Sequence, residues 1–163
     1  MERNSIAGIA ADRNEARITL IGIADQPGTV AAVMKPLADA GIQVDMIVHA
    51  ATAGAGQSDL TFTLPRASLA EALGAIEARR ESIGYARMIH DDTVAKVSIV
   101  GVGIRSNPAL AATMFDTLAN EGINLLAVTA SEIKVSALIG EDQMELAVRV
   151  LHSAFGLDQD EAA

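Results

Sequence analysis

The chain has 163 residues, a formal net charge of −9 and no cysteine, and half of its residues are hydrophobic although it holds only three Phe, one Tyr and no Trp. The acidic surplus argues against nucleic acid as a partner, because phosphate binding needs a basic surface, and the absence of cysteine excludes disulfides and thiolate metal sites. No apolar run is long enough to cross a membrane and the N-terminus has no signal-peptide core, so we expect a cytoplasmic protein of one ordinary domain or two small ones, with no membrane partner.

The first segments of the chain alternate between strand and turn patterns. Residues 5–12 (SIAGIAAD) are typical of a strand, and residues 17–24 predict another. The sequence Asp25-Gln26-Pro27-Gly28 then has the composition of a turn. A helix follows, ending at Gly41, and Pro36 inside it predicts either a kink or a distortion of the first turns, because proline removes a backbone hydrogen bond. The apolar stripe of this helix consists of Val30, Val33, Met34 and Leu37.

The next elements complete a pattern of six. Residues 42–51 predict a strand, and residues 59–65 (DLTFTLP) alternate as a half-buried strand does. Ser68 and Glu71 have the spacing of a capping box at the start of a second helix, which is expected to bury Leu69, Leu73 and Ile76. Residues 85–92 form the last predicted strand, and the order is β-α-β-β-α-β.

An internal repeat then organises the whole chain. The segment 18–47 (ITLIGIADQPGTVAAVMKPLADAGIQVDMI) aligns with 97–128 (VSIVGVGIRSNPALAATMFDTLANEGINLLAV). Gly22 falls on Gly101, 79 residues later, whereas Gly41 falls on Gly122, 81 residues later, so the second turn is two residues longer. A period near 80 residues indicates two copies of one small domain.

The second copy lacks a fourth strand of its own. Its predicted strands and helices occupy 95–103, 108–121, 123–131, 133–140 and 141–155, after which only an acidic tail remains. The strand at 5–12 is unused by the first copy, and a bare sheet edge would expose unpaired backbone groups. We therefore predict an α+β fold of two ferredoxin-like βαββαβ domains, with the N-terminal strand completing the second sheet. The expected boundaries are 17–92 for the first domain, 5–12 plus 93–156 for the second, and 157–163 for the tail.

Motifs of catalysis are weak or missing. The chain has no phosphate-binding loop and no nucleophile elbow, and the GVG at 101–103 fits a closely packed strand end better than a dinucleotide site. His49, His90 and His152 lack metal-ligand spacing. His90-Asp91-Asp92 is interpreted as a turn into the second copy. We predict no catalytic residue, no metal and no cofactor.

The strand-to-helix turns are better candidates for a binding site. A helix N-terminus leaves backbone N–H groups that favour an anion, such as the carboxylate of an amino acid. Asp25 can accept hydrogen bonds from an ammonium group, and Gly28 allows a ligand to approach the backbone closely. The alternative is an ordinary turn in which Asp25 only caps the helix.

The strand–DxPG–helix–GI–strand pattern resembles the ACT domain, a small-molecule regulatory module. More specifically, the chain resembles the regulatory region of aspartate kinase (aspartokinase) from about residue 6 to about residue 155. The segments that carry the resemblance are GIAADRNEARITLIGIADQPGTVAAV, AGIQVDMIV, DLTFTLPR, KVSIVGVGIRSNPALAATMF and EGINLLAVTASEIKVSALI.

This resemblance implies a role in regulation. Aspartate kinase phosphorylates aspartate with ATP and opens the synthesis of lysine, threonine and methionine, and its paired ACT domains bind end-product amino acids that inhibit the kinase. The kinase domain of the family is N-terminal, and its lysine-and-glycine motif is absent here. The resemblance therefore implies a non-catalytic small subunit or fragment that binds threonine, lysine or both. Its expected partners are an aspartate kinase catalytic domain or subunit and a second copy of itself, because ACT sheets pair edge to edge.

The resemblance also implies two sets of effector residues. The main set is Asp25, Gln26, Pro27, Gly28, Thr29, Val30, His49, Asn124 and Leu125. The pseudo-equivalent set is Ser106, Asn107, Pro108, Ala109, Leu110 and Val48. At one position this chain departs from the family, which commonly has Gln-Asn where His49-Ala50 stands. Histidine partly mimics an amide but titrates near neutral pH, so we expect effector affinity to change between pH 5.5 and 7.5.

Three other functions fit the same secondary-structure order. An RNA-binding module needs aromatic platforms and a basic face, which this composition lacks. A small ferredoxin-like enzyme needs an acid–base pair or a nucleophile, and none is apparent. An ACT regulatory subunit of another amino-acid enzyme, such as acetolactate synthase, is the third alternative, although the run SEIKVSALI favours aspartate kinase.

Overall fold

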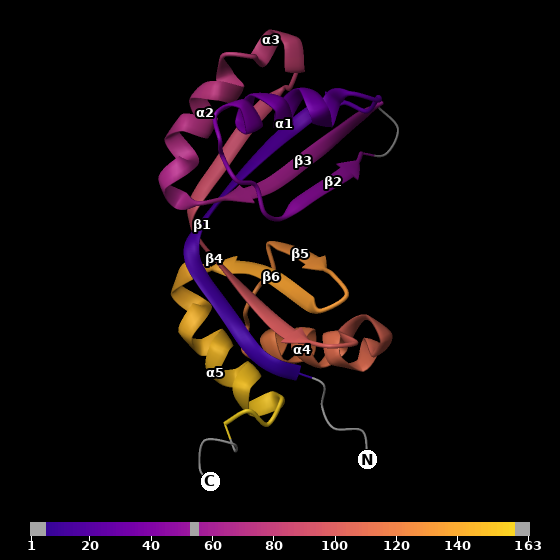
Figure 1. Ribbon diagram of the computed structural model, residues 1–163, viewed down its shortest axis with the longest axis vertical. Helices are drawn as coiled ribbons and strands as arrows, with labels where there is room; N and C mark the ends of the chain where they lie inside the picture. The colour runs from indigo at the N-terminus through magenta and orange to yellow at the C-terminus, as the bar shows by residue number, and fades with distance from the viewer. Residues whose placement is uncertain (1–5, 53–55, 159–163) are drawn as a thin grey trace. The chain divides into compact units, whose positions relative to one another are not determined.

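The computed structural model describes residues 6–52 and 56–158, and the chain divides into two compact units (Figure 1). The first unit is Asn14–Asp92. The second unit joins the residues up to Arg13 with those from Thr93 onward. The N-terminal strand therefore completes the second sheet, as the sequence predicts. Ser5 of the predicted strand and residues 159–163 of the predicted tail lie outside the described residues.

Two long strands contribute to both units. Strand β1 runs over Ile6–Ala24 and strand β4 over Arg87–Gly101. The predicted break between 12 and 17 and the predicted turn at His90-Asp91-Asp92 are both wrong. These stretches are polar but contain no glycine or proline, so nothing in the backbone interrupts the extended chain. Their side chains also make contacts, for example an ion pair of 3.9 Å between Arg17 and Asp91.

The first unit is a four-stranded sheet with helices packed on one face. Its strands follow the order β2-β3-β1-β4, and β3 is antiparallel to both neighbours. This is the strand order of a ferredoxin-like βαββαβ domain. The elements besides β1 and β4 are α1 (Thr29–Asp39), β2 (Ile47–Ala51), β3 (Gln57–Leu64), η1 (Arg66–Ser68), α2 (Leu69–Glu77) and α3 (Arg80–Ile83).

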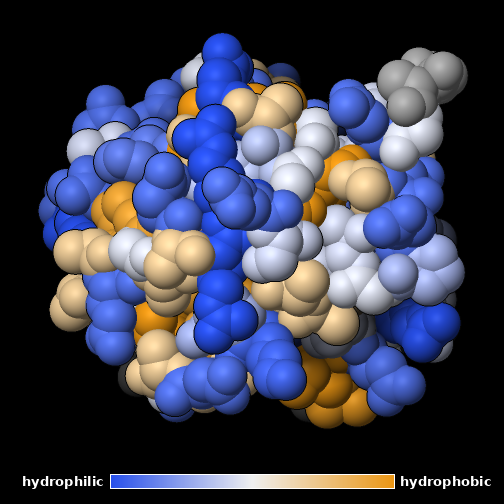
Figure 2. Space-filling model, turned by 90° about the horizontal axis from the view of Figure 1, so that it is seen from above, coloured by the Kyte–Doolittle hydropathy of each residue, from blue (hydrophilic) through white to orange (hydrophobic). Residues whose placement is uncertain are grey.

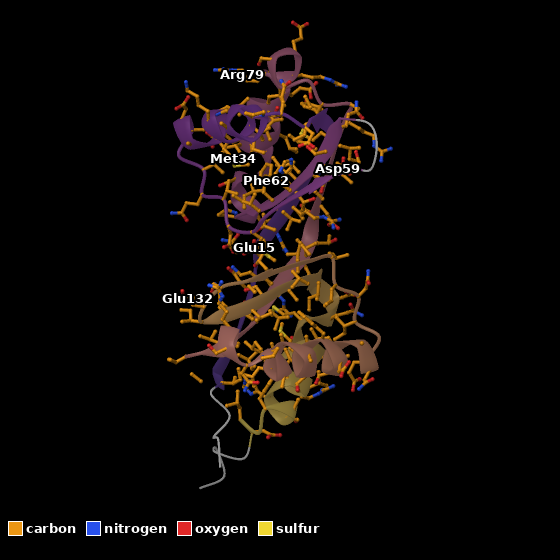
Figure 3. All side chains as sticks on the ribbon, turned by 90° about the vertical axis from the view of Figure 1, so that its right-hand side faces the viewer. Glu15, Met34, Asp59, Phe62, Arg79 and Glu132 are labelled. Atoms are coloured by element: carbon orange, nitrogen blue, oxygen red, sulfur yellow. The ribbon has the colours of Figure 1, made fainter. Side chains whose placement is uncertain are left out.

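The core of the first unit lies between the sheet and the helices. Leu60, Phe62 and Leu64 of β3 are fully buried, which confirms the alternation predicted for that strand. Met34 of α1 packs against the same core (Figure 3). Leu69 and Ile76 are buried as predicted, with Ala72 between them, whereas Leu73 is only partly buried. Figure 2 views the end that carries α3, where apolar residues appear in separate small groups among polar ones.

The start of α2 differs from the capping-box prediction. Ser68 makes no side-chain bond to the helix. Its backbone, at φ −90° and ψ −4°, already has helical geometry because the 3₁₀ turn η1 leads directly into α2. A capping side chain needs an extended backbone at its own residue to reach the helix N–H groups, and Ser68 does not have one.

The helix ends follow the glycine prediction. Gly41 adopts φ 72° and donates its N–H to the Ala38 carbonyl, while Ile42 donates to Leu37, as in a Schellman motif. Helix α1 stays helical through the buried Pro36. The following strand is shorter than predicted and begins at Ile47. At the residue before it, the N–H of Met46 bonds to the side-chain hydroxyl of Thr63, while the Thr63 backbone carbonyl accepts from Asp45.

The second unit repeats this architecture. Its sheet has the order β1-β4-β6-β5, again the ferredoxin-like arrangement, with β6 antiparallel to β4 and β5. Ile6 is 5% exposed and joins the core, so the N-terminal strand is packed as well as paired. The remaining elements are η2 (Ile104–Ser106), α4 (Pro108–Asn120), β5 (Ala127–Ala130), β6 (Lys134–Gly140), η3 (Glu141–Gln143) and α5 (Met144–Ala154).

The C-terminal end of the described chain is packed onto this second unit. Leu157 packs against the core, and Asp158 accepts a hydrogen bond of 2.9 Å from the Ser153 hydroxyl. The first residues of the predicted tail are thus part of the folded unit. Among the described residues, no helix has the length and apolar character that crossing a membrane requires.

Candidate functional site

The turn between β1 and α1 is exposed and tightly organised. Gly28 has φ 92° and precedes the helix, and Thr29, which is buried, donates its N–H to the Gln26 carbonyl. The first intrahelical bond runs from the Ala32 N–H to the Gly28 carbonyl at 3.0 Å. The N–H groups of Val30 and Ala31 come before it, and such N–H groups in the first turn point out of the helix end, which is the geometry that favours an anion.

Asp25 lies beside this helix end without capping it. Helix α1 has no side-chain cap, so the interpretation of Asp25 as an ordinary capping residue is wrong. Its side chain is exposed, as are those of Gln26 and Pro27. The turn therefore carries an exposed carboxylate at Asp25 and, a few residues later, the first backbone N–H groups of α1. These are the two groups that the ammonium and the carboxylate of an amino acid need.

Strand β3 anchors the turn through backbone positions. The N–H of Asp25 donates to the Gly56 carbonyl at 2.9 Å. One step earlier, the pairing of β1 with β3 shifts register between Leu20 and Ile23, and Gly22 in this bulge adopts φ 72°. The Gly22 N–H donates to the Asp59 carboxylate at 3.1 Å. The entry to the turn is thus held by the first residues of β3.

His49 belongs to the same end of the first unit. It pairs with Leu60, so it stands on the sheet face that carries the core and the helices. Its Nε2 lies 2.8 Å from the hydroxyl oxygen of Ser58, a fully buried residue that pairs with Ile23 at the end of β1. The structure therefore places His49 and the Asp25–Gly28 turn at the same end of the sheet, near the start of β3. Ala50 is on the opposite face.

The other predicted effector residues are divided between the units. Asn124 is exposed and Leu125 packs on the core of the second unit, in the segment before β5. Val48 is in the first unit, whereas Ser106, Asn107, Pro108, Ala109 and Leu110 are in the second. Neither predicted set is assembled within a single unit.

The second unit has a cavity of about 440 Å³ beside its own turn. Of the predicted residues, Pro108 lines it, while Leu110 is buried in the core beneath. Arg105 and Ser131, which the sequence prediction missed, also line it. The repeat alignment could have predicted Ser131, because this residue aligns with the one after His49. It could not have predicted Arg105, which lies in the two-residue insertion and has no counterpart in the first copy. The full lining is Ile104, Arg105, Pro108, Ala111, Ala130, Ser131 and Val135.

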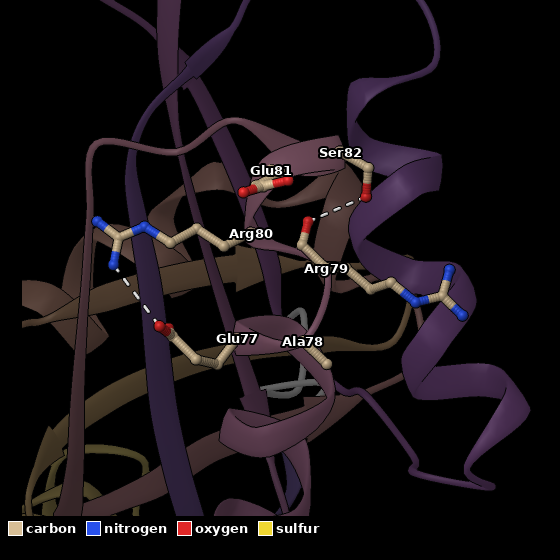
Figure 4. Close-up of a pocket in the computed structure, with 6 residues that line it drawn as sticks. All are labelled: Glu77, Ala78, Arg79, Arg80, Glu81 and Ser82. Atoms are coloured by element: carbon tan, nitrogen blue, oxygen red, sulfur yellow. Dashed lines mark hydrogen bonds and ion pairs between the residues drawn. The ribbon is translucent and has the colours of Figure 1, made fainter.

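A further hollow of about 470 Å³ lies at the junction of α2 and α3 (Figure 4). Glu77 accepts a hydrogen bond of 2.7 Å from the buried Tyr85 hydroxyl, and the Arg80 guanidinium lies 5.1 Å from the centre of the Tyr85 ring. Burial, together with the hydrogen bond and the negative charge of Glu77, raises the pKa of Tyr85 to about 12. These contacts fasten α3 to α2, which gives the cluster a structural role.

Comparison with known proteins identifies the repeated unit. ACT domain models match residues 17–81 and 97–155. An aspartokinase from Pseudomonas aeruginosa is 45% identical over 158 residues, covering 97% of this chain and 38% of that protein. An aspartokinase from Mycolicibacterium smegmatis is 38% identical over the whole chain, which is 39% of that protein. The chain thus spans about two fifths of the length of these curated relatives.

Solved structures match the chain over nearly their full length. A structure described as aspartokinase alpha and beta subunits contains a chain that is 48% identical, with a TM-score of 0.86 and 99% of that chain covered. The ligand-free regulatory subunit of aspartate kinase from Thermus thermophilus is 40% identical, with a TM-score of 0.87 and 99% covered. The chain therefore belongs to the aspartokinase family and corresponds to its regulatory region of two ACT domains.

Proposed function

We propose that this chain is the non-catalytic regulatory subunit or region of an aspartate kinase, and that it acts in the cytoplasm. In this role it binds threonine, lysine or both as end products and lowers the phosphorylation of aspartate by ATP. The observation that carries the proposal is the match, at 40% identity and over 99% of its length, to a solved aspartate kinase regulatory subunit.

The proposed main effector site is the first-unit turn. The carboxylate of the amino acid binds the N–H groups of Val30 and Ala31 at the start of α1, and its ammonium binds Asp25. The turn forms one side of the proposed site, which also includes Gln26, Pro27, Gly28 and Thr29. The proposed opposite side is His49 of β2. The proposed set of effector residues also includes Asn124 and Leu125. This assignment is supported by the exposed Asp25 carboxylate beside an uncapped helix end.

The proposed second effector site is the second-unit turn, formed by Ser106, Asn107, Pro108, Ala109 and Leu110 with Val48. The cavity beside Pro108 supports it. The two sites differ in charge, because Ser106 aligns with Asp25 and offers no carboxylate to an ammonium group. We therefore expect the first site to bind a free amino acid more tightly.

The proposed partners are a catalytic domain or subunit of aspartate kinase and a second copy of this chain. Strands β2 and β5 each stand at the end of the strand order, and each carries an exposed branched residue at the same repeat position, Ile47 and Val128. Unpaired edge strands are ready to pair with another chain. Such an assembly transmits binding to the kinase only if the effector prefers one of its states.

A reconstitution tests this function. The chain is mixed with the catalytic part of an aspartokinase, and aspartate phosphorylation is measured with and without threonine, lysine and the pair. The proposal predicts complex formation on size-exclusion chromatography and inhibition that requires the added chain. The proposal is contradicted if the complex forms but its aspartate phosphorylation is unchanged by threonine, by lysine and by the pair. It is also contradicted if no complex forms with any aspartokinase catalytic part.

A further inference from the structure

We propose that Asp59 is a positioning residue of the first-unit effector site, holding the Asp25–Gly28 turn in place through the backbone of Gly22. The inference rests on the proposed function, because it assigns a role at the proposed site. Asp59 itself does not contact the effector in this account.

The argument begins at the bulge in β1. A bulge inserts a residue into one strand and leaves backbone groups outside the regular ladder. Here the register shifts between Leu20 and Ile23, and the N–H of Gly22 is satisfied by the carboxylate of Asp59 at 3.1 Å. Asp59 is partly buried and lies near the start of β3, beyond Phe62 (Figure 3). A hydrogen bond to a charged acceptor is roughly twice as strong as a neutral one.

The second repeat has no bulge at the matching position, because the pairing of β4 with β6 keeps one register from Val94 to Val100. Gly101 aligns with Gly22, and its N–H donates to the backbone carbonyl of Ile133 at 2.8 Å. A backbone acceptor is present whatever side chain the residue carries. Of these two aligned glycines, Gly22 is therefore the one whose N–H is held by a side chain.

The position of Asp59 links the two walls of the proposed site. Three residues after Gly22, the N–H of Asp25 bonds to Gly56, so the whole entry to the turn is fixed on the start of β3. Ser58, the neighbour of Asp59, contacts His49 at 2.8 Å on the opposite face of the strand. One dipeptide of β3 thus sets the separation between the turn and His49. Loss of the Asp59 acceptor frees the bulge and moves the Asp25 carboxylate relative to His49.

The test compares three substitutions in the full chain. Asp59→Asn keeps an oxygen acceptor at nearly the same place, whereas Asp59→Leu has similar size and no acceptor. Asp59→Val is a second variant without an acceptor, chosen because a β-branched residue is favourable in a strand. We expect hydrogen exchange of the Gly22 amide to accelerate about tenfold or more in Leu and Val but not in Asn, because only Asn preserves the hydrogen bond. The Gly101 amide is the internal control and stays protected in all three.

Binding of threonine and of lysine, measured by calorimetry, gives the functional readout. The Asn variant is expected to bind like the wild type, and the Leu and Val variants about tenfold more weakly, which corresponds to about 1.4 kcal/mol. Wild-type affinity in Leu and Val, or an Asn variant that loses binding as Leu does, overturns the positioning role. If the wild type binds neither amino acid, the proposed function fails. The exchange of Gly22 and the amide shifts of Asp25, Gln26, Gly28 and Thr29 then still decide whether Asp59 positions the turn.

Discussion

His49 shows at the scale of a single residue what the sequence predicts and what it leaves out. Its membership of the effector site follows from the resemblance to aspartate kinase and stays a prediction, while the fold places it at the same end of the sheet as the Asp25 turn. Its contact with Ser58 was not predicted, because a cross-strand diagonal depends on the register of β2 on β3, which turn composition does not fix. The bond of Asp59 was not predicted for the same reason, because its partner Gly22 lies 37 residues away in the sequence, at a bulge.

Substitution of His49 gives the first prediction. Its imidazole lies 2.8 Å from the Ser58 hydroxyl, and a Gln side chain can also donate and accept hydrogen bonds, whereas Ala cannot. We expect His49→Ala to weaken effector binding about tenfold, which corresponds to about 1.4 kcal/mol, and His49→Gln to retain most of the affinity. Calorimetry on the three proteins measures it. Wild-type affinity in His49→Ala removes His49 from the site.

Two glycines of β1 and its turn give a matched pair of stability predictions. Both have positive φ, but a Cβ at Gly28 meets open space, whereas a Cβ at Gly22 lies 3.0 Å from the Cβ of Ala86. We expect Gly28→Ala to lower the free energy of unfolding by about 1–2 kcal/mol, the cost of left-handed geometry, and Gly22→Ala to lower it further. Denaturant titration, monitored by NMR signals of residues in the first unit, measures the free energy of unfolding of both variants. An equal loss in the two variants shows that the contact with Ala86 is not tight.

At the scale of elements, the correct predictions are those that rest on residues with special backbone geometry, glycine and proline. Gly41 and Gly122 end their helices with positive φ, and Pro108 begins α4. Polar residues such as His90 and Asp91 failed as turn signals, because polarity alone does not bend an extended chain. Ser68 failed as a cap because η1 is helical up to that residue, a tertiary detail that the capping pattern does not contain.

The junction of α2 and α3 has a predicted pH dependence. The pKa of Tyr85 is raised to about 12 from 10.0, so the neutral phenol is favoured by the fold. The stabilisation is fully present below pH 10 and is lost as the pH rises from about 10 toward 12, because the unfolded chain ionises first.

Tyr85→Phe checks this account. The variant removes the ionisable group, and we expect its free energy of unfolding to fall less than that of the wild type between pH 9 and 11. Denaturant titrations of both proteins at each pH measure the difference. Parallel pH profiles would falsify the assignment of the alkaline loss to Tyr85.

The N-terminal part of β1 gives a prediction about which unit it stabilises. Ile6 is buried and Ile9 partly buried in the second core. Truncating a buried isoleucine to alanine costs about 2–5 kcal/mol, so Ile6→Ala, like deletion of residues 1–12, should lower protection in the second unit more than in the first. Hydrogen exchange resolved by residue measures this. A greater loss of hydrogen-exchange protection among the amides of residues 25–85 would contradict the role of the N-terminal strand in the second unit.

At the scale of the whole molecule, the repeat made the fold predictable. Two copies of one pattern, one lacking a strand and one preceded by a spare strand, have a single economical solution, and the fold adopts it. The candidate site was predictable only in part. Asp25 and His49 follow from the repeat and the resemblance, whereas the contribution of Asn124 and Leu125 depends on assembly, which no pattern within one copy specifies.

Calorimetric titration of the chain with threonine and lysine, singly and together, tests the central claim most directly. The account predicts saturable heat for at least one of them, lost in Asp25→Asn, which removes the charge that binds the ammonium. Asp39→Asn, at the exposed far end of α1, is the matched control and should bind normally. No heat from either amino acid or from the pair, or unchanged binding in Asp25→Asn, would contradict it.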